Sequence, residues 1–290
     1  MDSIRTLLFA PGDNPHRMAR AVATEADAVV IDLEDAVALE SKPVARHYVR
    51  DFLAASDSER IYARVNAVGG DDYHSDLDAL SPVIGSVSGL VIPKVESATQ
   101  LIELDADLRS LESEHSPQTP LPVIAILETA AGILAAQSIA HVPRVQRLIF
   151  GTLDLAAELR VTPTLTGSEY LHARSHLVLA SRAAGLAGPI DGPHTRVDDP
   201  SGLGASAQHA RTLGFTGKVI IHPAQIAPVH AAFAPSEAEL IHARAVVDAY
   251  RQSHLNGLGA ARLPDGTFID RPVVVRAAAL LGLEPKRVHL

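Results

Sequence analysis

Short apolar runs of strand type alternate along the chain with longer segments of helical periodicity. The runs are rich in Val, Ile and Leu, whereas segments such as 97–114 and 169–185 repeat apolar residues at helical spacing. The predicted strands are 6–10, 28–34, 60–66, 89–95, 122–128, 147–154, 188–191 and 218–223. Strands that alternate with helices indicate a parallel sheet.

Eight strand–helix units favour a (β/α)8 TIM barrel over a doubly wound sheet. Such a barrel needs about thirty residues a unit, and doubly wound sheets usually have about five or six strands. We expect residues 1–235 to form the barrel and residues 236–290 to form a C-terminal helical extension or lid. Within the extension, helices are predicted at 236–253 and 272–282, joined by a flexible Gly-rich loop at 256–266 and a short run at 267–270.

Polar residues stand at the ends of the predicted strands, where a barrel of this type has its active site. We predict inward-facing series that begin apolar and end polar or charged. The series are Val30, Asp32 and Glu34; Tyr62, Arg64 and Asn66; Leu90, Ile92 and Lys94; Ile124, Ile126 and Glu128; and Leu148, Phe150, Thr152 and Asp154, with Asp191 and His222 ending the last two strands. Taken singly, Asp35 or Asp191 is equally consistent with a helix cap. Taken together, the set indicates a site.

Glu128 and Asp154 follow consecutive strands, so we expect their carboxylates to converge. Two anions that close need a cation between them or a shared proton. Oxygen ligands with no Cys or His pair beside them favour Mg2+, or Mn2+, over zinc. The expected site is a divalent ion held by Glu128 and Asp154, with Asp32, Glu34 and Asp35 holding its waters.

Arg64 is predicted to point into the barrel beside this ion, where packing does not require a guanidinium. Its planar group suits bidentate capture of a carboxylate; the alternative is a salt bridge to Glu34 or Asp32. A metal beside an arginine indicates a 2-oxo acid, because the ion can chelate its carboxylate and polarise its carbonyl. Such a site fits aldol or Claisen chemistry.

Other candidates are less specific. Lys94 and His222 are more often orienting or structural groups than catalytic ones, although a Schiff base at Lys94 is conceivable. Arg17 and Arg20 follow the first strand, where they either contact a phosphorylated ligand or solvate a helix.

Composition narrows the classes of partner. The formal net charge of −9, with acids and bases interspersed, leaves no basic surface for nucleic acid or membrane. The absence of Cys excludes disulfides, thiolate metal sites and cysteine nucleophiles. No segment reaches the roughly 18 apolar residues of a membrane span, so a cytoplasmic protein is the default expectation.

These residues together resemble the HpcH/HpaI aldolase and citrate lyase β-subunit family, specifically its CoA-thioester branch with malyl-CoA and citramalyl-CoA lyases. The resemblance runs in order through nearly the whole chain. It rests on LLFAPGDNPHRMARA, DAVVIDLEDAV, ARVNA, GLVIPKVES, AILETAAGI, RLIFGTLDLAAEL, GPIDGP, GFTGKVIIHPAQI and GTFIDRPVVVRA. The stretch GTLDLAAELRV departs from the family pattern, since relatives commonly have Asn or Ser near Leu153 and Gly near Arg160.

The resemblance implies that Glu128 and Asp154 ligate Mg2+ and that DLEDAV supplies the supporting carboxylates. It implies that Arg64, with Glu128 at the metal, binds oxaloacetate, pyruvate or glyoxylate. A CoA thioester is the implied co-substrate, with Arg17 and Arg20 as possible CoA contacts. The implied assembly is a homotrimer or hexamer.

Asp270 in GTFIDRP corresponds, by the resemblance, to an aspartate that reaches a neighbouring subunit's site and acts as acid or base at the acetyl-CoA methyl. The alternative is that Asp270 only caps the helix that follows. The expected activity is Mg-dependent carbon–carbon lysis of a 3-hydroxyacyl-CoA, with citryl-CoA cleaved to acetyl-CoA and oxaloacetate. The alternatives are a malyl-CoA or citramalyl-CoA lyase, a malyl-CoA thioesterase, an aldolase on free acids, or a subunit that is inactive without an acyl-carrier partner.

Overall fold

The computed structural model describes residues 4–115, 120–164 and 166–283. The chain divides into two compact units, Met1–Phe233 and Ala234–Leu290. Residues 284–290 of the predicted C-terminal extension lie outside the described residues. Each unit has a hydrophobic core of its own.

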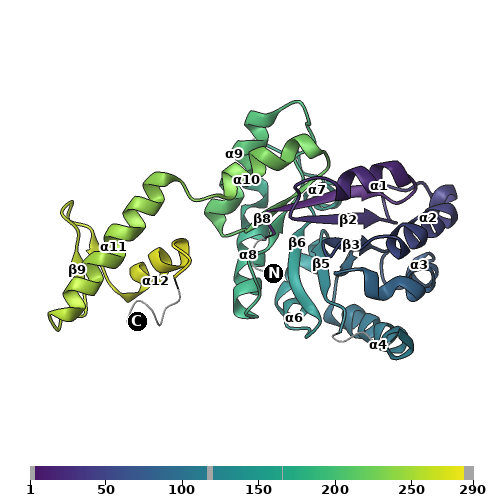
Figure 1. Cartoon of the computed structure of the whole chain (residues 1–290), viewed down its shortest axis with the longest axis horizontal. Coiled ribbons are helices and arrows are strands. Elements are labelled where there is room, and N and C mark those ends of the chain that lie inside the picture. The colour runs from purple at the N-terminus through teal and green to yellow at the C-terminus, as the bar shows by residue number, and fades with distance from the viewer. Residues whose placement is uncertain (1–3, 116–119, 165, 284–290) are drawn as a thin grey trace. The chain divides into compact units, whose positions relative to one another are not determined.

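The first unit is a closed barrel of eight parallel strands that follow one another around the ring in chain order, with helices outside them (Figure 1). The strands are β1 (Thr6–Pro11), β2 (Ala28–Asp32), β3 (Ile61–Arg64), β4 (Gly89–Ile92), β5 (Val123–Leu127), β6 (Val145–Phe150), β7 (Ile190–Asp191) and β8 (Gly217–Ile220). Parallel pairing of β1 with β8, from Thr6 opposite Lys218 onward, closes the ring. The predicted TIM barrel is confirmed.

Short turns and capped helices connect the strands. The α-helices are α1 (Pro15–Val22), α2 (Lys42–Ala54), α3 (Tyr73–Leu80), α4 (Ala98–His115), α5 (Ala130–Leu134), α6 (Ala136–Ala140), α7 (Thr152–Leu159), α8 (Leu171–Ala183), α9 (Pro200–Leu213) and α10 (Ile226–Phe233). The 3-10 turns are η1 (Leu39–Ser41), η2 (Ser81–Ser86), η3 (Ser168–Tyr170) and η4 (Pro223–Gln225). Asn14 caps α1 and Asp199 caps α9, each followed by a proline at the first helical position.

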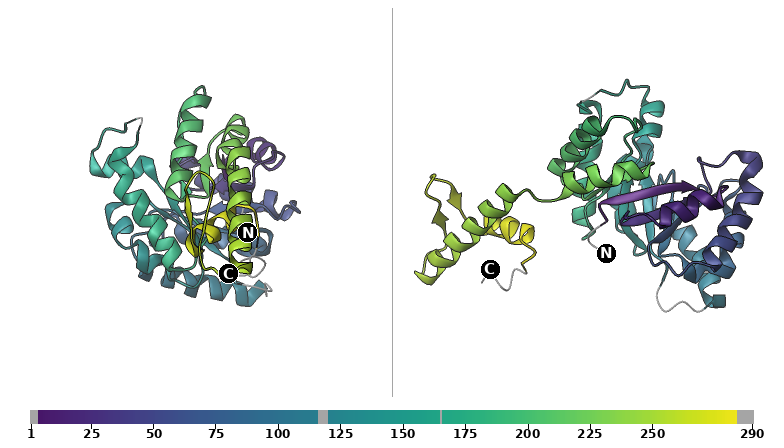
Figure 2. Two further views of the ribbon diagram at one scale, coloured as in Figure 1. Left: turned by 90° about the vertical axis from the view of Figure 1, so that its left-hand side faces the viewer. Right: turned by 45° about the horizontal axis from the view of Figure 1, so that its top comes forward.

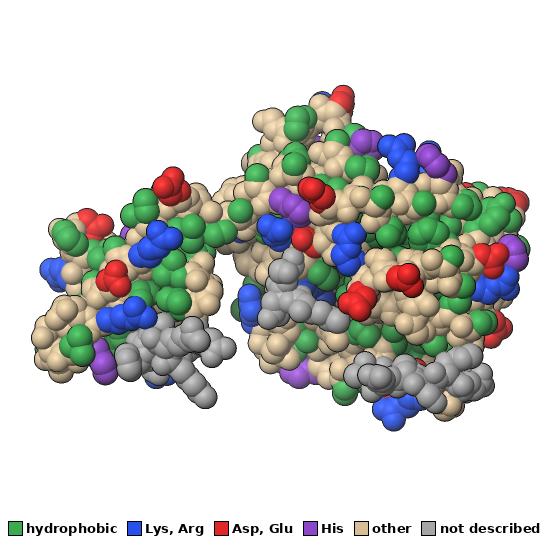
Figure 3. Space-filling model, viewed as in Figure 1, with side chains coloured by type: hydrophobic (Ala, Val, Ile, Leu, Met, Phe, Trp, Pro, Cys, Tyr) green, Lys and Arg blue, Asp and Glu red, His purple; other side chains and the backbone are tan. Residues whose placement is uncertain are grey.

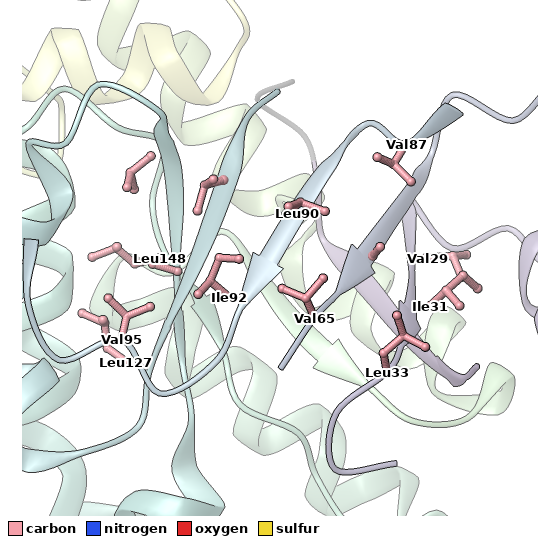
Figure 4. Packing of buried hydrophobic residues seen from close by; sticks show 14 of the residues in the cluster. Val29, Ile31, Leu33, Val65, Val87, Leu90, Ile92, Val95, Leu127 and Leu148 are labelled. Carbon is pink, nitrogen blue, oxygen red and sulfur yellow. The ribbon is translucent and has the colours of Figure 1, made fainter. Parts of the chain in front are cut away.

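The barrel core has two layers, and they correct part of the predicted side-chain alternation. Inside the ring lie Leu7, Ala28, Val30, Tyr62, Val91, Ile124, Ile126, Ile149, Ile190 and Val219. Leu90 and Ile92 of β4 and Leu148 and Phe150 of β6 belong instead to the outer cluster, between strands and helices. Figure 4 draws part of this cluster and labels Leu90, Ile92 and Leu148. The predicted inward series is therefore wrong for these two strands. The runs Leu90–Ile92 of β4 and Leu148–Phe150 of β6 are apolar on both faces, so they did not mark which face points inward.

The second unit consists of α11 (Glu237–Leu255), the hairpin strands β9 (Ala261–Arg262) and β10 (Phe268–Ile269), and α12 (Arg271–Leu280), seen from two further sides in Figure 2. Ser236 and Glu239 form a capping box that starts α11. Ile269 and Val274 are fully buried between the helices. Because β9 pairs with β10, the stretch predicted as a flexible Gly-rich loop contains one arm of a hairpin.

The surface carries no large area of a single charge on the face drawn in Figure 3, where acidic and basic side chains of the described residues are interspersed. None of the helices in the described part of the chain combines the length and apolar character needed to cross a membrane.

Candidate active site at the barrel mouth

Glu128 follows β5 directly and is buried, with only 3% of its surface exposed. Its Oε1 accepts a hydrogen bond from the backbone N–H of Lys94 at 2.8 Å. Its carboxyl group also lies within hydrogen-bonding reach of Asp154. Burial, followed by this neighbouring carboxylate, raises the pKa of Glu128 to about 8. The two groups therefore do not readily carry two negative charges without a cation between them.

Asp154 reaches this position from a helix and not from a strand. We predicted it at the end of an inward series on 147–154, but β6 ends at Phe150, and Asp154 lies in the first turn of α7. Gly151 between them allows the approach, since a Cβ on Gly151 would lie 2.3 Å from the Cβ of Glu128. A carboxylate in the first helical turn is also favoured by the helix dipole.

Arg64, at the end of β3, is held by two carboxylates. Its Nε donates to Oδ1 of Asp32 at 2.7 Å and its Nη2 to Oδ2, while Nη1 pairs with Glu34 at 2.8 Å. The guanidinium lies over the Phe9 ring, 5.1 Å from its centroid. The salt bridge that the sequence left as an alternative is thus present. A guanidinium has five N–H groups, so two remain without a partner among the described residues.

Lys94 occupies a left-handed backbone conformation, with φ of 52°, two residues after the end of β4. This turn, and not the strand alternation, brings its ammonium group to Glu34 and to within 3.5 Å of Asp35. Although burial opposes it, these carboxylates, Glu34 foremost, raise the pKa of Lys94. The sequence did not reveal that Lys94 connects Glu34 to Glu128.

The mouth carries more acid than base. Five carboxylates, Asp32, Glu34, Asp35, Glu128 and Asp154, accompany two cations, Arg64 and Lys94. Within 4–115, 120–164 and 166–283, no group of three or more His, Cys, Asp or Glu side chains is arranged to hold a metal ion. The pair Glu128 and Asp154 nevertheless fits Mg2+, which commonly takes one or two protein carboxylates and fills its other positions with water or substrate oxygens.

Arg17 and Arg20 of α1 line a pocket of about 400 Å³ beside the ends of β1 and β8. Phe9, which stacks under Arg64, lines the same pocket, so it adjoins the mouth. His222 also lines it, but its Nδ1 accepts a hydrogen bond from the backbone N–H of Ala224 at 3.1 Å and so caps η4.

Two residues of the predicted inward series lie away from the mouth. Asn66 donates to the buried Asp76 of α3, on the helical side of β3. Asp191 is fully buried outside the ring, where it pairs with Arg174 of α8 and Lys218 of β8. Ile190 fills the barrel interior, and consecutive strand residues face opposite sides, so Asp191 faces outward.

Asp270 belongs to the second unit and caps α12. Its Oδ1 accepts a hydrogen bond from the backbone N–H of Val273 at 3.4 Å, with a proline following at the second helical position. The helix-cap role that the sequence left as an alternative is therefore present.

Comparisons with known proteins place these features in context. A sequence model of the HpcH/HpaI aldolase/citrate lyase family matches residues 5–223. The chain is 38% identical to a citrate lyase subunit beta-like protein of Deinococcus radiodurans, over 97% of each chain. It is 36% identical to a (3S)-malyl-CoA thioesterase of Cereibacter sphaeroides, over 96% of this chain and 93% of the relative. It is similar to the crystal structure of CitE from Mycobacterium tuberculosis in complex with magnesium, acetoacetate and coenzyme A, with 35% identity, a TM-score of 0.81 and 99% of each chain covered.

Proposed function

The chain belongs to the HpcH/HpaI aldolase/citrate lyase family, and from this premise we propose that it is a Mg2+-dependent carbon–carbon lyase of the citrate lyase β-subunit type. Its substrate is a 3-hydroxyacyl-CoA thioester such as citryl-CoA, which it cleaves to acetyl-CoA and oxaloacetate. The observation that carries the proposal is the contact of the buried Glu128 with the half-buried Asp154, beside Arg64. The magnesium, acetoacetate and coenzyme A bound by the CitE relative support it.

The metal site consists of Glu128 and Asp154, whose mutual repulsion is relieved by a divalent cation. When bound there, Mg2+ supplies Lewis-acid polarisation of the 2-oxo acid carbonyl and stabilises the oxyanion. The backbone N–H of Lys94 orients Glu128. Asp32, Glu34 and Asp35 hold the surrounding waters.

Arg64 binds the carboxylate of the 2-oxo acid half with its two remaining N–H groups. Asp32 and Glu34 fix the guanidinium, so little side-chain freedom is lost on binding. Arg17 and Arg20, in the adjoining pocket, contact the phosphates of CoA. The acid half of the substrate thus binds at Arg64, and the CoA half binds in the adjoining pocket.

Asp270 protonates the thioester enolate as the carbon–carbon bond breaks, acting in the site of a neighbouring subunit within a trimer or hexamer. Two substitutions separate this role from helix capping. Asp270→Ala removes both the cap and the carboxylate, whereas Asp270→Ser keeps a capping oxygen but cannot transfer the proton. We expect both variants to lose lyase turnover by about a hundredfold or more, within the usual range for a general acid. Full turnover in Asp270→Ser would contradict the assignment.

The decisive test is a steady-state assay on citryl-CoA, malyl-CoA and citramalyl-CoA, with and without Mg2+. We expect Mg2+-dependent release of acetyl-CoA and a 2-oxo acid. The matched variants Glu128→Gln and Asp154→Asn should lose Mg2+ binding in isothermal titration, whereas Glu158→Gln, on the same helix as Asp154, should retain it. Unaltered Mg2+ binding when both carboxylates are removed would refute the proposed site.

A thioesterase is the second candidate, because one relative is a (3S)-malyl-CoA thioesterase. The same assay distinguishes the two activities. Free CoA thiol, detected without accumulation of acetyl-CoA, identifies hydrolysis. Binding of Mg2+ and oxaloacetate without turnover of any thioester would indicate a subunit that needs an acyl-carrier partner.

A further inference from the structure

A second pocket, of about 570 Å³, lies on the outer side of the barrel between β6–β8 and the helices. Its lining includes Arg174 of α8, Lys218 of β8 and Ser206 of α9. Lys218 stands between Gly217 and the inward-facing Val219, so its side chain leaves the ring on the helical side. Neither Arg64 nor Arg17 lines this pocket, which is therefore separate from the mouth.

Two buried basic side chains share a single buried carboxylate at the base of this pocket. Asp191 accepts a hydrogen bond from Nε of Arg174 at 3.0 Å and from Nζ of Lys218 at 2.5 Å. Arg174 is 7% exposed and Lys218 is 1% exposed. Burial lowers the pKa of Lys218, although Asp191 opposes this shift. Arg174 is therefore the side chain that keeps its positive charge beside the pocket.

The other carboxylates nearby have partners of their own. Glu169 accepts hydrogen bonds from the backbone N–H and the hydroxyl of Thr164. Asp199 accepts from the backbone N–H of Gly202 at 2.9 Å, as the cap of α9. Among the described residues Lys218 pairs with Asp191 and with neither of these two carboxylates, and Arg174 acts on Glu169 only at longer range.

The guanidinium of Arg174 is fixed in place with donors to spare. It lies over the rings of Phe150 and Tyr170, 5.3 Å and 5.5 Å from their centroids. Beyond Asp191, its one hydrogen bond is a long one of 3.5 Å from Nη1 to the carbonyl of Gly167. Its Nη2 has no partner in the described part of the chain. Lys218 similarly uses one of three N–H groups. In the described part of the chain, Nη2 of Arg174 is not one of the buried polar atoms that lack a partner. It is therefore open to the pocket, where an anionic group can accept a hydrogen bond from it.

We propose that this pocket binds a small anionic molecule through a carboxylate or phosphate group, which pairs with Arg174 and Lys218. A planar guanidinium with free N–H groups binds either group in bidentate fashion, and Lys218 adds a further N–H donor. Hydroxyl groups such as that of Ser206 line the remainder of the pocket and suit a polar body. Thr152 and Leu153 also line it, so the ligand contacts the turn of α7 that carries Asp154.

The test is isothermal titration of the full-length protein with inorganic phosphate in one arm and malonate in the other. We expect at least one anion to bind. The variants Arg174→Gln, which removes the free donors, and Ser206→Phe, which fills the pocket without touching the ion cluster, should each weaken binding about tenfold or more. Binding of phosphate alone identifies a phosphorylated ligand, and binding of malonate alone identifies a carboxylate ligand.

The matched control is Arg182→Gln, which removes the same charge from an exposed position on the same helix and should leave binding unchanged. Binding that persists in Arg64→Gln and Arg17→Gln separates this pocket from the mouth. If Arg174→Gln fails to fold, Ser206→Phe decides the question. Absence of binding of both anions to the unaltered protein, or equal binding in Ser206→Phe, would overturn the proposal.

Discussion

Gly151 determines how closely Glu128 and Asp154 approach each other. In Gly151→Ala the new Cβ would lie 2.3 Å from the Cβ of Glu128 and 2.6 Å from its Oε2, so the carboxylate must move. We expect a loss of Mg2+ affinity of about tenfold or more and a decrease in the free energy of unfolding of about 1–3 kcal/mol. Isothermal titration and urea denaturation measure the two effects.

The control for that substitution is Gly204→Ala, within α9, where no atom lies within 4 Å of the added Cβ. We expect Gly204→Ala to raise the free energy of unfolding by up to about 1 kcal/mol, because alanine is the better helix former. If Gly151→Ala bound Mg2+ as the unaltered protein does, the position of Glu128 would not depend on this contact.

Arg160 ends α7 in the left-handed region, with φ of 54° and ψ of 34°. A residue with a Cβ is strained there by about 1 kcal/mol or more, and glycine is not. This is the stretch in which the chain departs from a glycine expected from the family resemblance. We predict that Arg160→Gly raises the free energy of unfolding by about 1 kcal/mol in urea denaturation.

Arg160→Ala is the matched control, since it removes the guanidinium but keeps the Cβ. Its stability should remain close to that of the unaltered protein. Equal stabilisation by the alanine and glycine variants would show that the side chain, and not the backbone conformation, is the cause.

At the scale of elements, Asp27 connects the start of β1 to α10 through hydrogen bonds. Its Oδ2 accepts hydrogen bonds from the backbone N–H groups of Arg5 and Thr6, both at 2.9 Å, and lies 3.1 Å from Nε2 of His230. Burial by itself would raise the pKa of Asp27, but the two N–H groups and the nearby cations lower it on balance. The folded state therefore favours the ionised form.

A pH dependence of stability follows from that shift. Because the pKa of Asp27 is lower in the folded than in the unfolded protein, its contribution is complete above the unfolded value of about 3.9 and is lost as the pH falls through the folded value. We expect Asp27→Asn to be less stable than the unaltered protein at pH 6, with a smaller further loss of stability on acidification below about pH 4. Urea denaturation at a series of pH values provides the measurement. Asp57→Asn, at an exposed position, is the control, and the prediction fails if both variants follow the same curve.

At the scale of the whole molecule, the two units have separate cores, and the second contains buried residues such as Tyr250, Ile269 and Val274. We predict that a chain ended at Phe233 folds cooperatively and binds Mg2+ but does not turn over a CoA thioester, because it lacks Asp270. Circular dichroism, isothermal titration and the thioester assay test these three points. Undiminished turnover by the shortened chain would show that the reaction does not need the second unit.

Much of the barrel was accessible from the sequence because its signals are local. Each strand is a short apolar run and each helix has its own periodicity, so the number and order of elements can be read without knowing their contacts. The sequence also predicted which face of β2, β3 and β5 points into the barrel, because a charged residue such as Asp32, Arg64 or Glu128 marks that face. For β4 and β6 the runs Leu90–Ile92 and Leu148–Phe150 are apolar on both faces, so the inward side was not marked.

The sequence by itself determined the fold class and the residues that carry charge at the strand ends. Only the tertiary structure decided which of these charges meet. Arg64 contacts Asp32 and Glu34 because β3 pairs with β2. Glu128 contacts Asp154 because β5 pairs with β6, and α7 starts directly after β6. Asp191 lies instead on the outer face of the barrel, where it pairs with Arg174 and Lys218 beside a different pocket. The physical reason is that alternation within a strand is a local property, whereas the pairing of ionised side chains depends on register, turns such as that at Lys94, and the absence of a Cβ at Gly151.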